Sequence, residues 1–100
     1  MTDPYHLQVV VQDRAVFDGE VTSIVVPGEE GYLGVLANHA PLLSTLGEGT
    51  LDIRGPKGAW TYEIRGGFLE VLNNEVTVLA DSVVEPSLPS SLLQTSREER

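Results

Sequence analysis

The sequence contains no cysteine, and it has few basic residues. The absence of cysteine excludes disulfides, thiolate zinc sites and cysteine nucleophiles, and it fits a reducing compartment. Six basic residues stand against 15 acidic ones, giving a net charge of −9, which argues against nucleic acid as a partner. There is no apolar run long enough to cross a bilayer, and no basic region followed by an apolar core at the amino terminus. The sequence therefore predicts a soluble, cytoplasmic product without a targeting peptide.

The length and composition support a single domain. A chain of 100 residues, 41% of them hydrophobic, can form one core that buries about 60 to 70% of the surface exposed by the unfolded chain. The acidic excess is strongest in the first half, where Arg14 is the only basic residue before Arg54. This excess serves either solubility or attraction to a basic surface of a partner protein, and charge alone leaves both interpretations open.

Alternation of apolar and polar residues runs through most of the chain. The stretch Tyr5–Gln12 places apolar residues at every second position, which is the period of a half-buried strand. Val16–Phe17 starts a second short strand, which Asp18–Gly19 is expected to break. Farther on, Thr50–Arg65 and Phe68–Ala80 each predict a hairpin. The turn of the first is expected at Gly55–Gly58 and that of the second at Asn73-Asn74, where asparagine tolerates left-handed backbone angles. Many short strands without an amphipathic stretch of helical length predict an all-β, antiparallel sandwich or barrel.

One segment departs from this alternation. In Gly31–Leu43, apolar residues are mixed with a histidine, glycines and a proline, which is too irregular for an ordinary helix or strand. It follows a loop, Pro27–Gly31, whose Pro-Gly start suits a tight turn. His39 within the segment has two open interpretations: a ring hydrogen-bonded in its own loop, or a ring that forms a partner surface with its apolar neighbours.

No catalytic, metal or cofactor site is predicted. His39 and Ser44 have neither a defined third partner nor the nucleophile-elbow pattern of a hydrolase. His6 and His39 lack metal-ligand spacing with each other or with a carboxylate. The glycines lie among strands, unlike those of phosphate-binding loops, which join a strand to a helix. We expect Trp60 and Tyr62 in the core rather than on a ligand platform.

Three blocks of the sequence, Gly31–Leu43, Gly66–Val71 and Val76–Asp81, together resemble the epsilon subunit of F-type ATP synthases, the foot of the rotating central stalk. The resemblance runs in order and in register from Tyr5 to about Asp81. It implies a flattened antiparallel β-sandwich of about ten short strands. It also implies a non-catalytic rotor subunit of a proton-translocating enzyme, without cofactor, held as a peripheral protein at the cytoplasmic face of the bacterial inner membrane.

The same resemblance implies two partner surfaces on the sandwich. The residues that would contact the gamma subunit of the stalk are Val11, His39 and Ser44. The residues that would contact the polar loops of the membrane-embedded c ring are Glu29, Glu30, Gly31 and Tyr32. Because those loops present basic side chains in the family, the acidic pair would speed and orient docking more than tighten it.

Two positions in these surfaces depart from the family pattern. Tyr32 stands where relatives often have an acid, and Ala37-Asn38 stands where they often have Pro-Gly. Tyr32 would replace a charge contact by an aromatic one. Asn38 tolerates the left-handed backbone conformation that glycine would otherwise supply, so we expect that loop to keep its shape.

The domain prediction is a β-sandwich over residues 1–86 and a mobile or weakly helical tail over residues 87–100. The carboxy-terminal pair of helices usual in the family is expected to be absent. We therefore expect a subunit that couples rotation to ATP synthesis without inhibiting ATP hydrolysis. Two other classes are kept as alternatives: a free-standing β-sandwich that binds a sugar or peptide, and a small hydrolase dependent on His39. Binding to a purified gamma subunit distinguishes the coupling function from both.

Overall fold

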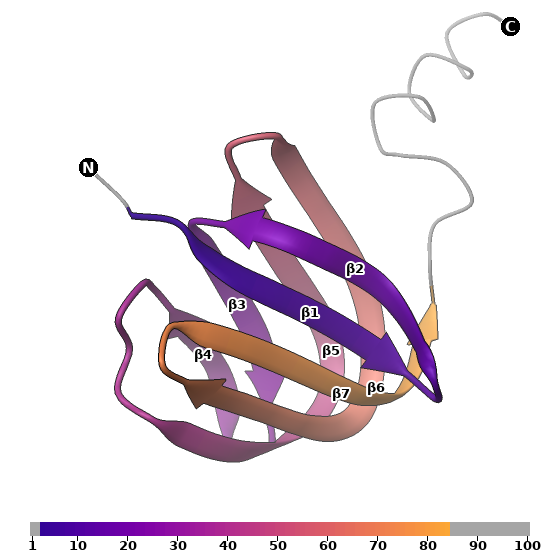
Figure 1. Cartoon of the computed structure of the whole chain (residues 1–100). Helices are drawn as coiled ribbons and strands as arrows, with labels where there is room; N and C mark the ends of the chain where they lie inside the picture. The colour runs from indigo at the N-terminus through magenta and orange to yellow at the C-terminus, as the bar shows by residue number, and fades with distance from the viewer. Residues whose placement is uncertain (1–2, 85–100) are drawn as a thin grey trace, which may run out of the picture.

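The structure, a computed structural model, describes residues 3–84 of the chain (Figure 1). The described residues form seven strands and no helix, which confirms the all-β prediction. The strands are β1 (Tyr5–Val11), β2 (Arg14–Val21), β3 (Ser23–Gly28), β4 (Gly31–Val35), β5 (Leu42–Gly55), β6 (Gly58–Leu72) and β7 (Glu75–Val84). The tail predicted for residues 87–100 lies outside the described residues.

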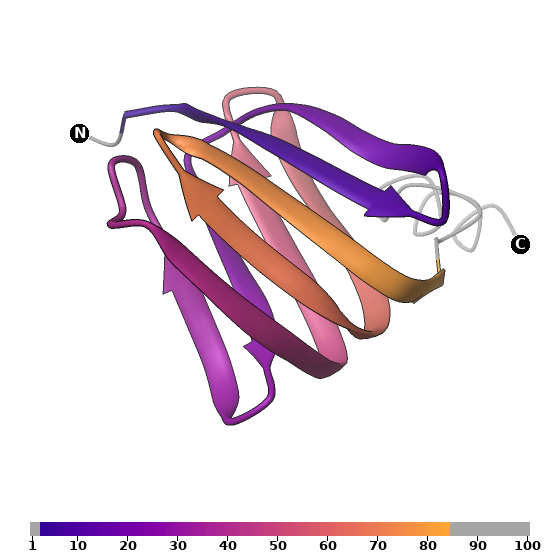
Figure 2. The ribbon, with the colours of Figure 1, turned by 60° about the horizontal axis from the view of Figure 1, so that its bottom comes forward.

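All seven strands belong to one sheet, in the order β2-β1-β7-β6-β5-β3-β4. Neighbours are antiparallel except β1 and β7, which run parallel. The sheet is strongly twisted and folds over a single core, so that β1 and β2 lie across from β3 (Figures 1 and 2). Where the chain passes from β2 to β3, the carbonyl oxygen of Arg54 accepts hydrogen bonds from the backbone N–H and the hydroxyl of Thr22, at 2.7 and 3.2 Å. This corner joins the two sides of the sandwich.

The core is built from the inward-facing side chains of every strand. The alternation predicted for Tyr5–Gln12 is confirmed, because Tyr5, Leu7, Val9 and Val11 are all buried. Tyr62 is buried, and Trp60 packs against the core with its ring edge-to-face to Phe17, the ring centroids 5.0 Å apart. Trp60 and Tyr62 are therefore part of the core, as predicted, whereas Phe68, the third aromatic residue of β6, is 48% exposed. No polar or charged side chain is buried in the described part of the chain.

Along each of the two long central strands, β5 and β6, the positions that face the core shift by one residue midway. In β6 the buried positions are even-numbered up to Ile64 and odd-numbered from Leu69. In β5 the same change occurs between Leu46 and Leu51. The pairing register of these strands with each other is the same on both sides of the change, so the backbone twists there without a bulge. The family resemblance implied about ten short strands. Seven are found in residues 3–84, and two of them, β5 and β6, are long, with 14 and 15 residues.

Gly67 lies where this change occurs in β6. Its backbone φ is 126°, a conformation that other residues rarely adopt. A Cβ atom at this position would overlap the carbonyl oxygen of Leu79 on the neighbouring strand and lie 2.8 Å from the Cα of Ala80. The close approach of β6 and β7 at this point therefore requires glycine.

The prediction that Asp18-Gly19 breaks the second strand is wrong. β2 continues through both residues, which pair with Gln8 and Leu7 of β1. The Asp18 carboxylate accepts hydrogen bonds from the side chains of His6, at 2.5 Å, and Gln8, at 3.5 Å. These cross-strand contacts outweigh the weak strand propensity of aspartate and glycine.

Candidate functional site

The acidic pair that was predicted to meet a partner forms a two-residue turn. β3 ends at Gly28 and β4 begins at Gly31, so only Glu29 and Glu30 connect them. The predicted loop started at Pro27, and this is wrong, because Pro27 and Gly28 belong to β3 and pair with β4. The two glycines allow the tight reversal: a Cβ on Gly28 would lie 2.7 Å from the carbonyl oxygen of Gly31. Both glutamates are exposed at the tip.

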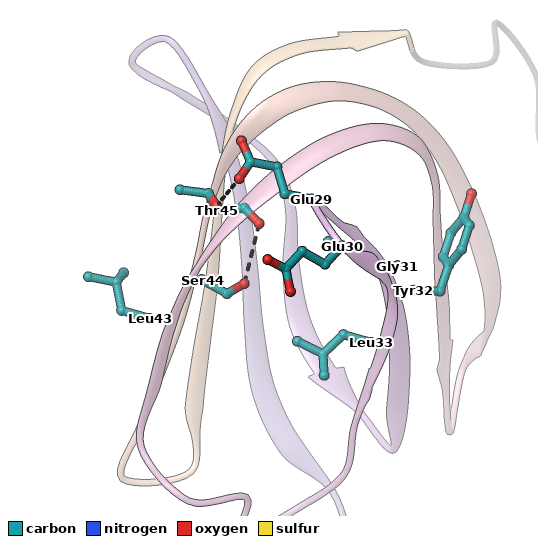
Figure 3. A pocket seen from close by; sticks show the side chains of 9 residues that line it. Glu29, Glu30, Gly31, Tyr32, Leu33, Leu43, Ser44 and Thr45 are labelled. Atoms are coloured by element: carbon teal, nitrogen blue, oxygen red, sulfur yellow. Dashed lines mark hydrogen bonds between the residues drawn. The ribbon is translucent and has the colours of Figure 1, made fainter.

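Beside this turn the sheet opens into a pocket. β3 pairs with β5 from Ser23 to Val25, and the next pair along β3 is Gly28 with Leu46. The edge of β5 before Leu46 has no paired residue on β3, so it stands apart from the start of β4. The gap is a pocket of about 520 Å³ (Figure 3). Its walls are the acidic turn, the start of β4 with Tyr32 and Leu33, and the β5 residues Leu43, Ser44 and Thr45.

The two glutamates of the turn are held differently. The backbone N–H of Glu29 donates to the carbonyl oxygen of Thr45 at 3.2 Å, and the Thr45 hydroxyl donates to Oε1 of Glu29 at 2.9 Å. Within the described part of the chain no hydrogen bond or ion pair engages the Glu30 carboxylate. Figure 3 shows that carboxylate lying between Ser44 and Leu33, inside the pocket, whereas Glu29 turns toward Thr45.

Tyr32 points away from the two glutamates (Figure 3). Its hydroxyl oxygen accepts a hydrogen bond from the backbone N–H of Thr50 at 3.1 Å. Thr50 lies in the part of β5 that has no partner on β3, so Tyr32 satisfies a donor that the sheet leaves unpaired. A Cβ on Gly49 would lie 2.5 Å from the Tyr32 hydroxyl, so glycine is needed for this approach. Tyr32 thus connects β4 to β5 across β3.

His39 lies in the connection between β4 and β5. Its Nδ1 donates a hydrogen bond to the carbonyl oxygen of Ala40 at 2.8 Å, so the ring is hydrogen-bonded within its own loop and stays partly exposed. The neighbouring Asn38 has φ of 63°, and its backbone N–H donates to the side-chain oxygen of Asn74 at 2.6 Å. The left-handed conformation predicted for Asn38 is confirmed, and the loop is fixed to the turn between β6 and β7.

The structure brings together some of the predicted contact residues and separates others. Glu29, Glu30, Gly31 and Tyr32 line one pocket with Ser44, although Ser44 was assigned to a different partner surface. Val11 is 8% exposed and belongs to the core, so its side chain gives little surface to a partner. The outward-facing residue at that end of β1 is its neighbour Val10. His39 lies in a separate loop.

A surface that the sequence analysis did not identify lies on the outer face of β1, β7, β6 and β5. Val10, Leu79 and Phe68 are adjacent across three neighbouring strands. The side chains of Phe68 and Leu79 are 48% and 46% exposed. Leu43, 71% exposed, and Leu72, 49% exposed, lie on the same outer face. We call these five residues the outer apolar strip. A signal for it was present, since Val10 is the one apolar residue on the polar side of the first strand.

The described residues offer little for catalysis. His39 and Ser44 hydrogen-bond to the carbonyl oxygens of Ala40 and Thr45, and no bond between their side chains is found among residues 3–84. The same residues contain no group of three histidines or carboxylates that could hold a metal ion. They also form no helix of the length and apolarity needed to cross a membrane.

Comparison with known sequences gives one family. The sequence family "ATP synthase, Delta/Epsilon chain, beta-sandwich domain" matches residues 4–86. The ATP synthase epsilon chain of Leptospira borgpetersenii is 45% identical over 76 residues, which cover 76% of this chain and 60% of that protein. The epsilon chain of Caulobacter vibrioides is 41% identical over 80 residues, covering 80% of this chain and 93% of that protein. The chain therefore spans about 60% of the Leptospira relative and nearly all of the Caulobacter one.

Solved structures agree with the sequences. The Euglena gracilis mitochondrial ATP synthase, solved as an OSCP/F1/c-ring assembly, contains a chain with a TM-score of 0.77 and 27% identity, matched over 96% of this chain and 62% of that one. A chain of the central stalk and c ring of the Tetrahymena thermophila enzyme has a TM-score of 0.68 at 16% identity, which supports the fold. It is matched over 94% of this chain and 88% of that one. The prediction of a non-catalytic ATP synthase subunit agrees with these relatives. The chain belongs to the delta/epsilon-chain family of ATP synthases and carries its β-sandwich domain.

Proposed function

We propose that this chain is a rotor subunit in the central stalk of a proton-translocating F-type ATP synthase, where it ties the gamma subunit to the c ring. It would transmit rotation and perform no reaction of its own. The observation that carries the proposal is a pair of neighbouring surfaces with different chemistry. Leu43 belongs to the outer apolar strip and also lines the pocket beside the acidic turn. One continuous sheet thus offers an apolar surface and an acidic one side by side.

The outer apolar strip is the surface best suited to the gamma subunit. Exposed apolar side chains gathered on one face are uncommon on free-standing proteins and form the centre of protein–protein interfaces. Phe68 is the anchor expected to matter most, because aromatic side chains dominate binding energies. His39 and Ser44 stay in the proposal as flanking contacts, and Val10 takes the place of the buried Val11.

The acidic turn is the surface suited to the c ring. Glu29 and Glu30 are exposed at the tip of the β3–β4 hairpin, next to an open pocket. A tip of this kind can reach between the loops of a larger assembly, and its charge attracts basic side chains before contact. In the bacterial cell this would place the chain at the cytoplasmic face of the inner membrane, as a peripheral subunit.

In this proposal the sandwich connects the gamma subunit to the c ring and does not inhibit ATP hydrolysis. Both surfaces named above lie within residues 10–79, so docking requires nothing outside the sandwich. We therefore expect the 100-residue polypeptide to restore coupling in an epsilon-depleted enzyme while leaving its ATP hydrolysis rate unchanged. Strong inhibition of hydrolysis would contradict this part of the proposal.

Calorimetric titration with the cognate gamma subunit tests the proposal. Phe68→Ser should weaken binding about tenfold, because it removes an interface anchor. The matched control is Val25→Ser on β3, which changes a 39% exposed apolar residue outside the strip and should leave the affinity within about twofold. Equal effects of the two substitutions would reject the strip as the gamma surface. Absence of binding by the unmodified chain would favour a free-standing binding module.

A further inference from the structure

The connection between β4 and β5, residues 36–41, borders the outer apolar strip. Pro41, at the end of this connection, lines a pocket of about 330 Å³ together with Leu43 and Leu72 of the strip. Leu36, at its start, is 58% exposed, and His39 in its middle is partly exposed. The connection therefore extends the surface proposed above for the gamma subunit.

Few interactions hold this connection in place. Within the described part of the chain, residues 36–41 pair with no strand, although the side chain of Ala37 packs against the core. The hydrogen bond between His39 and Ala40 lies inside the connection. Among residues 3–84, the one hydrogen bond found between the connection and another element runs from the backbone N–H of Asn38 to Oδ1 of Asn74, over 2.6 Å. The shape of the connection thus depends on a single side chain of the β6–β7 turn, which lies next to it (Figures 1 and 2).

Asn74 stands at a position where the turn itself would favour glycine. β6 ends at Leu72 and β7 begins at Glu75, so Asn73 and Asn74 alone form the hairpin turn, with φ values of 53° and 63°. A two-residue turn with positive φ at both positions prefers asparagine followed by glycine. Glycine at position 74 would suit this backbone but would offer no oxygen to the Asn38 amide. The side chain of Asn74 is therefore explained by the connection that it reaches rather than by its own turn.

The bond is made at the point where the connection reverses its direction. Asn38 has φ of 63°, the left-handed conformation that few residues adopt. An acceptor fixed on the neighbouring turn favours this conformation, and with it the placement of Leu36 and His39 on either side. A segment that already has its bound shape loses less conformational entropy when a partner binds, so binding is tighter without any additional contact.

We propose that Asn74 is a positioning residue for docking on the gamma subunit. Its side-chain oxygen holds the β4–β5 connection in the shape that the partner binds, and its own side chain stays outside the contact. This inference rests on the proposed coupling function. It adds a residue from a different turn, and it assigns that residue an effect on the ordering of the surface rather than on its contacts.

Calorimetric titration of the chain with the cognate gamma subunit tests this role. Asn74→Gly removes the acceptor without straining the turn, and it should weaken binding about fivefold because the connection must then be ordered on binding. Asn73→Gly is the matched control, because it makes the same change at the other positive-φ position and keeps the bond to Asn38; the affinity should stay within about twofold. Asn74→Asp keeps an oxygen acceptor in place and should also stay within about twofold.

A second measurement reports on the bond itself. In the NMR spectrum of the chain without its partner, the Asn38 amide should exchange faster with solvent in Asn74→Gly, and its resonance should shift as the hydrogen bond is lost. The same amide should be unchanged in Asn73→Gly and in Asn74→Asp. Thermal unfolding of the two glycine variants should be similar, which separates an effect on the connection from a general loss of stability.

The outcomes separate the inference from the function on which it rests. Weaker gamma binding confined to Asn74→Gly, together with the change at the Asn38 amide, is the expected result. Equal affinities of the two glycine variants would overturn the positioning role and leave the coupling function standing. Asn74→Asp with a preserved Asn38 amide but weak binding would also overturn it, because the side chain would then touch the partner. Failure of the unmodified chain to bind gamma would overturn both the inference and the gamma half of the proposed function.

Discussion

The hydroxyl of Tyr5 on β1 donates a hydrogen bond to the carbonyl oxygen of Val35 on β4, over 2.6 Å. β4 is one edge of the sheet and β1 is next to the other edge, so the bond joins the two ends of the folded sheet. Both residues are buried, and burial raises the pKa of Tyr5 to about 12, which keeps the hydroxyl neutral. Tyr5→Phe should lower the free energy of unfolding by about 1 to 3 kcal/mol, because it leaves a buried carbonyl oxygen unpaired. Urea unfolding measures this change.

The control for Tyr5→Phe is Tyr62→Phe. The Tyr62 hydroxyl donates to the carbonyl oxygen of Val16 over 3.2 Å at a partly buried site. Removal of this hydroxyl should lower the free energy of unfolding by about 0.5 to 1.5 kcal/mol, since water can reach the Val16 carbonyl oxygen that loses its donor. If both substitutions lower the free energy of unfolding equally, the bond between Tyr5 and Val35 does not stabilise the sandwich more than the bond between Tyr62 and Val16.

His6 should make the stability of the sandwich depend on pH. Its Nε2 lies 2.5 Å from the Asp18 carboxylate and its Nδ1 lies 3.8 Å from Glu75. The hydrogen bond to Asp18 is the main reason that the pKa of His6 is raised above its usual value of 6.5, and the charge of Glu75 adds to it. A raised pKa in the folded state means that the stabilisation is full below pH 6.5 and is lost as pH rises through the higher value. Thermal unfolding from pH 5.5 to 8.5 should show this loss.

His6→Gln is the matched variant for this pH dependence. Glutamine can still donate to Asp18 but does not titrate. The difference in stability between the unmodified chain and His6→Gln should therefore shrink as the pH rises from 6 to 8. A difference that stays constant over this range would show that His6 does not bind its proton more tightly in the folded state.

Gly67→Ala should be among the most destabilising single substitutions in the chain. The new methyl group would overlap the Leu79 carbonyl, and the residue would be held at φ of 126°. We expect a loss of at least about 3 kcal/mol or failure to fold, since backbone strain and steric overlap add. Gly34→Ala is the comparison, because its methyl would come no closer than 4.0 Å to any other group and its cost should be below about 1 kcal/mol. Chemical denaturation of both proteins checks the ranking.

The bond between Tyr32 and Thr50 can be tested without a partner. Tyr32→Phe keeps the ring over Gly49 and removes the acceptor for the Thr50 amide. The expected loss of stability is about 0.5 to 1.5 kcal/mol, and hydrogen exchange of the Thr50 amide should become faster while that of buried Leu51 changes little. Unchanged exchange at Thr50 would mean that another group protects this amide, and that the Tyr32 hydroxyl does not hold β4 to β5.

Local patterns in the sequence predicted those parts of the fold that depend on local chemistry. The alternation in β1 and the inward aromatic residues of β6 were predicted because period-two burial is visible along a single strand. The turn at Asn73 and Asn74 was predicted because asparagine tolerates left-handed backbone angles, and their φ values are 53° and 63°. The family resemblance was carried by several such patterns in the right order.

Features that depend on distant partners were not predictable in this way. The parallel pairing of β1 with β7 joins residues about 70 positions apart, such as His6 and Glu75, and leaves no local pattern. The strand through Asp18 was missed because its support comes from His6 and Gln8 on another strand. The outer apolar strip and the different surroundings of Glu29 and Glu30 also arise only when separate strands come together.

Proton-driven ATP synthesis by an epsilon-depleted enzyme is the most direct test of the central claim. Membrane vesicles containing the cognate enzyme without its epsilon subunit would be given the unmodified chain, and ATP synthesis under an imposed proton gradient would be measured. The coupling function predicts that synthesis is restored, and that Phe68→Ser restores it only at a higher protein concentration, as weaker binding requires. If saturating chain that is bound to the gamma subunit leaves synthesis at the depleted level, the coupling function is contradicted.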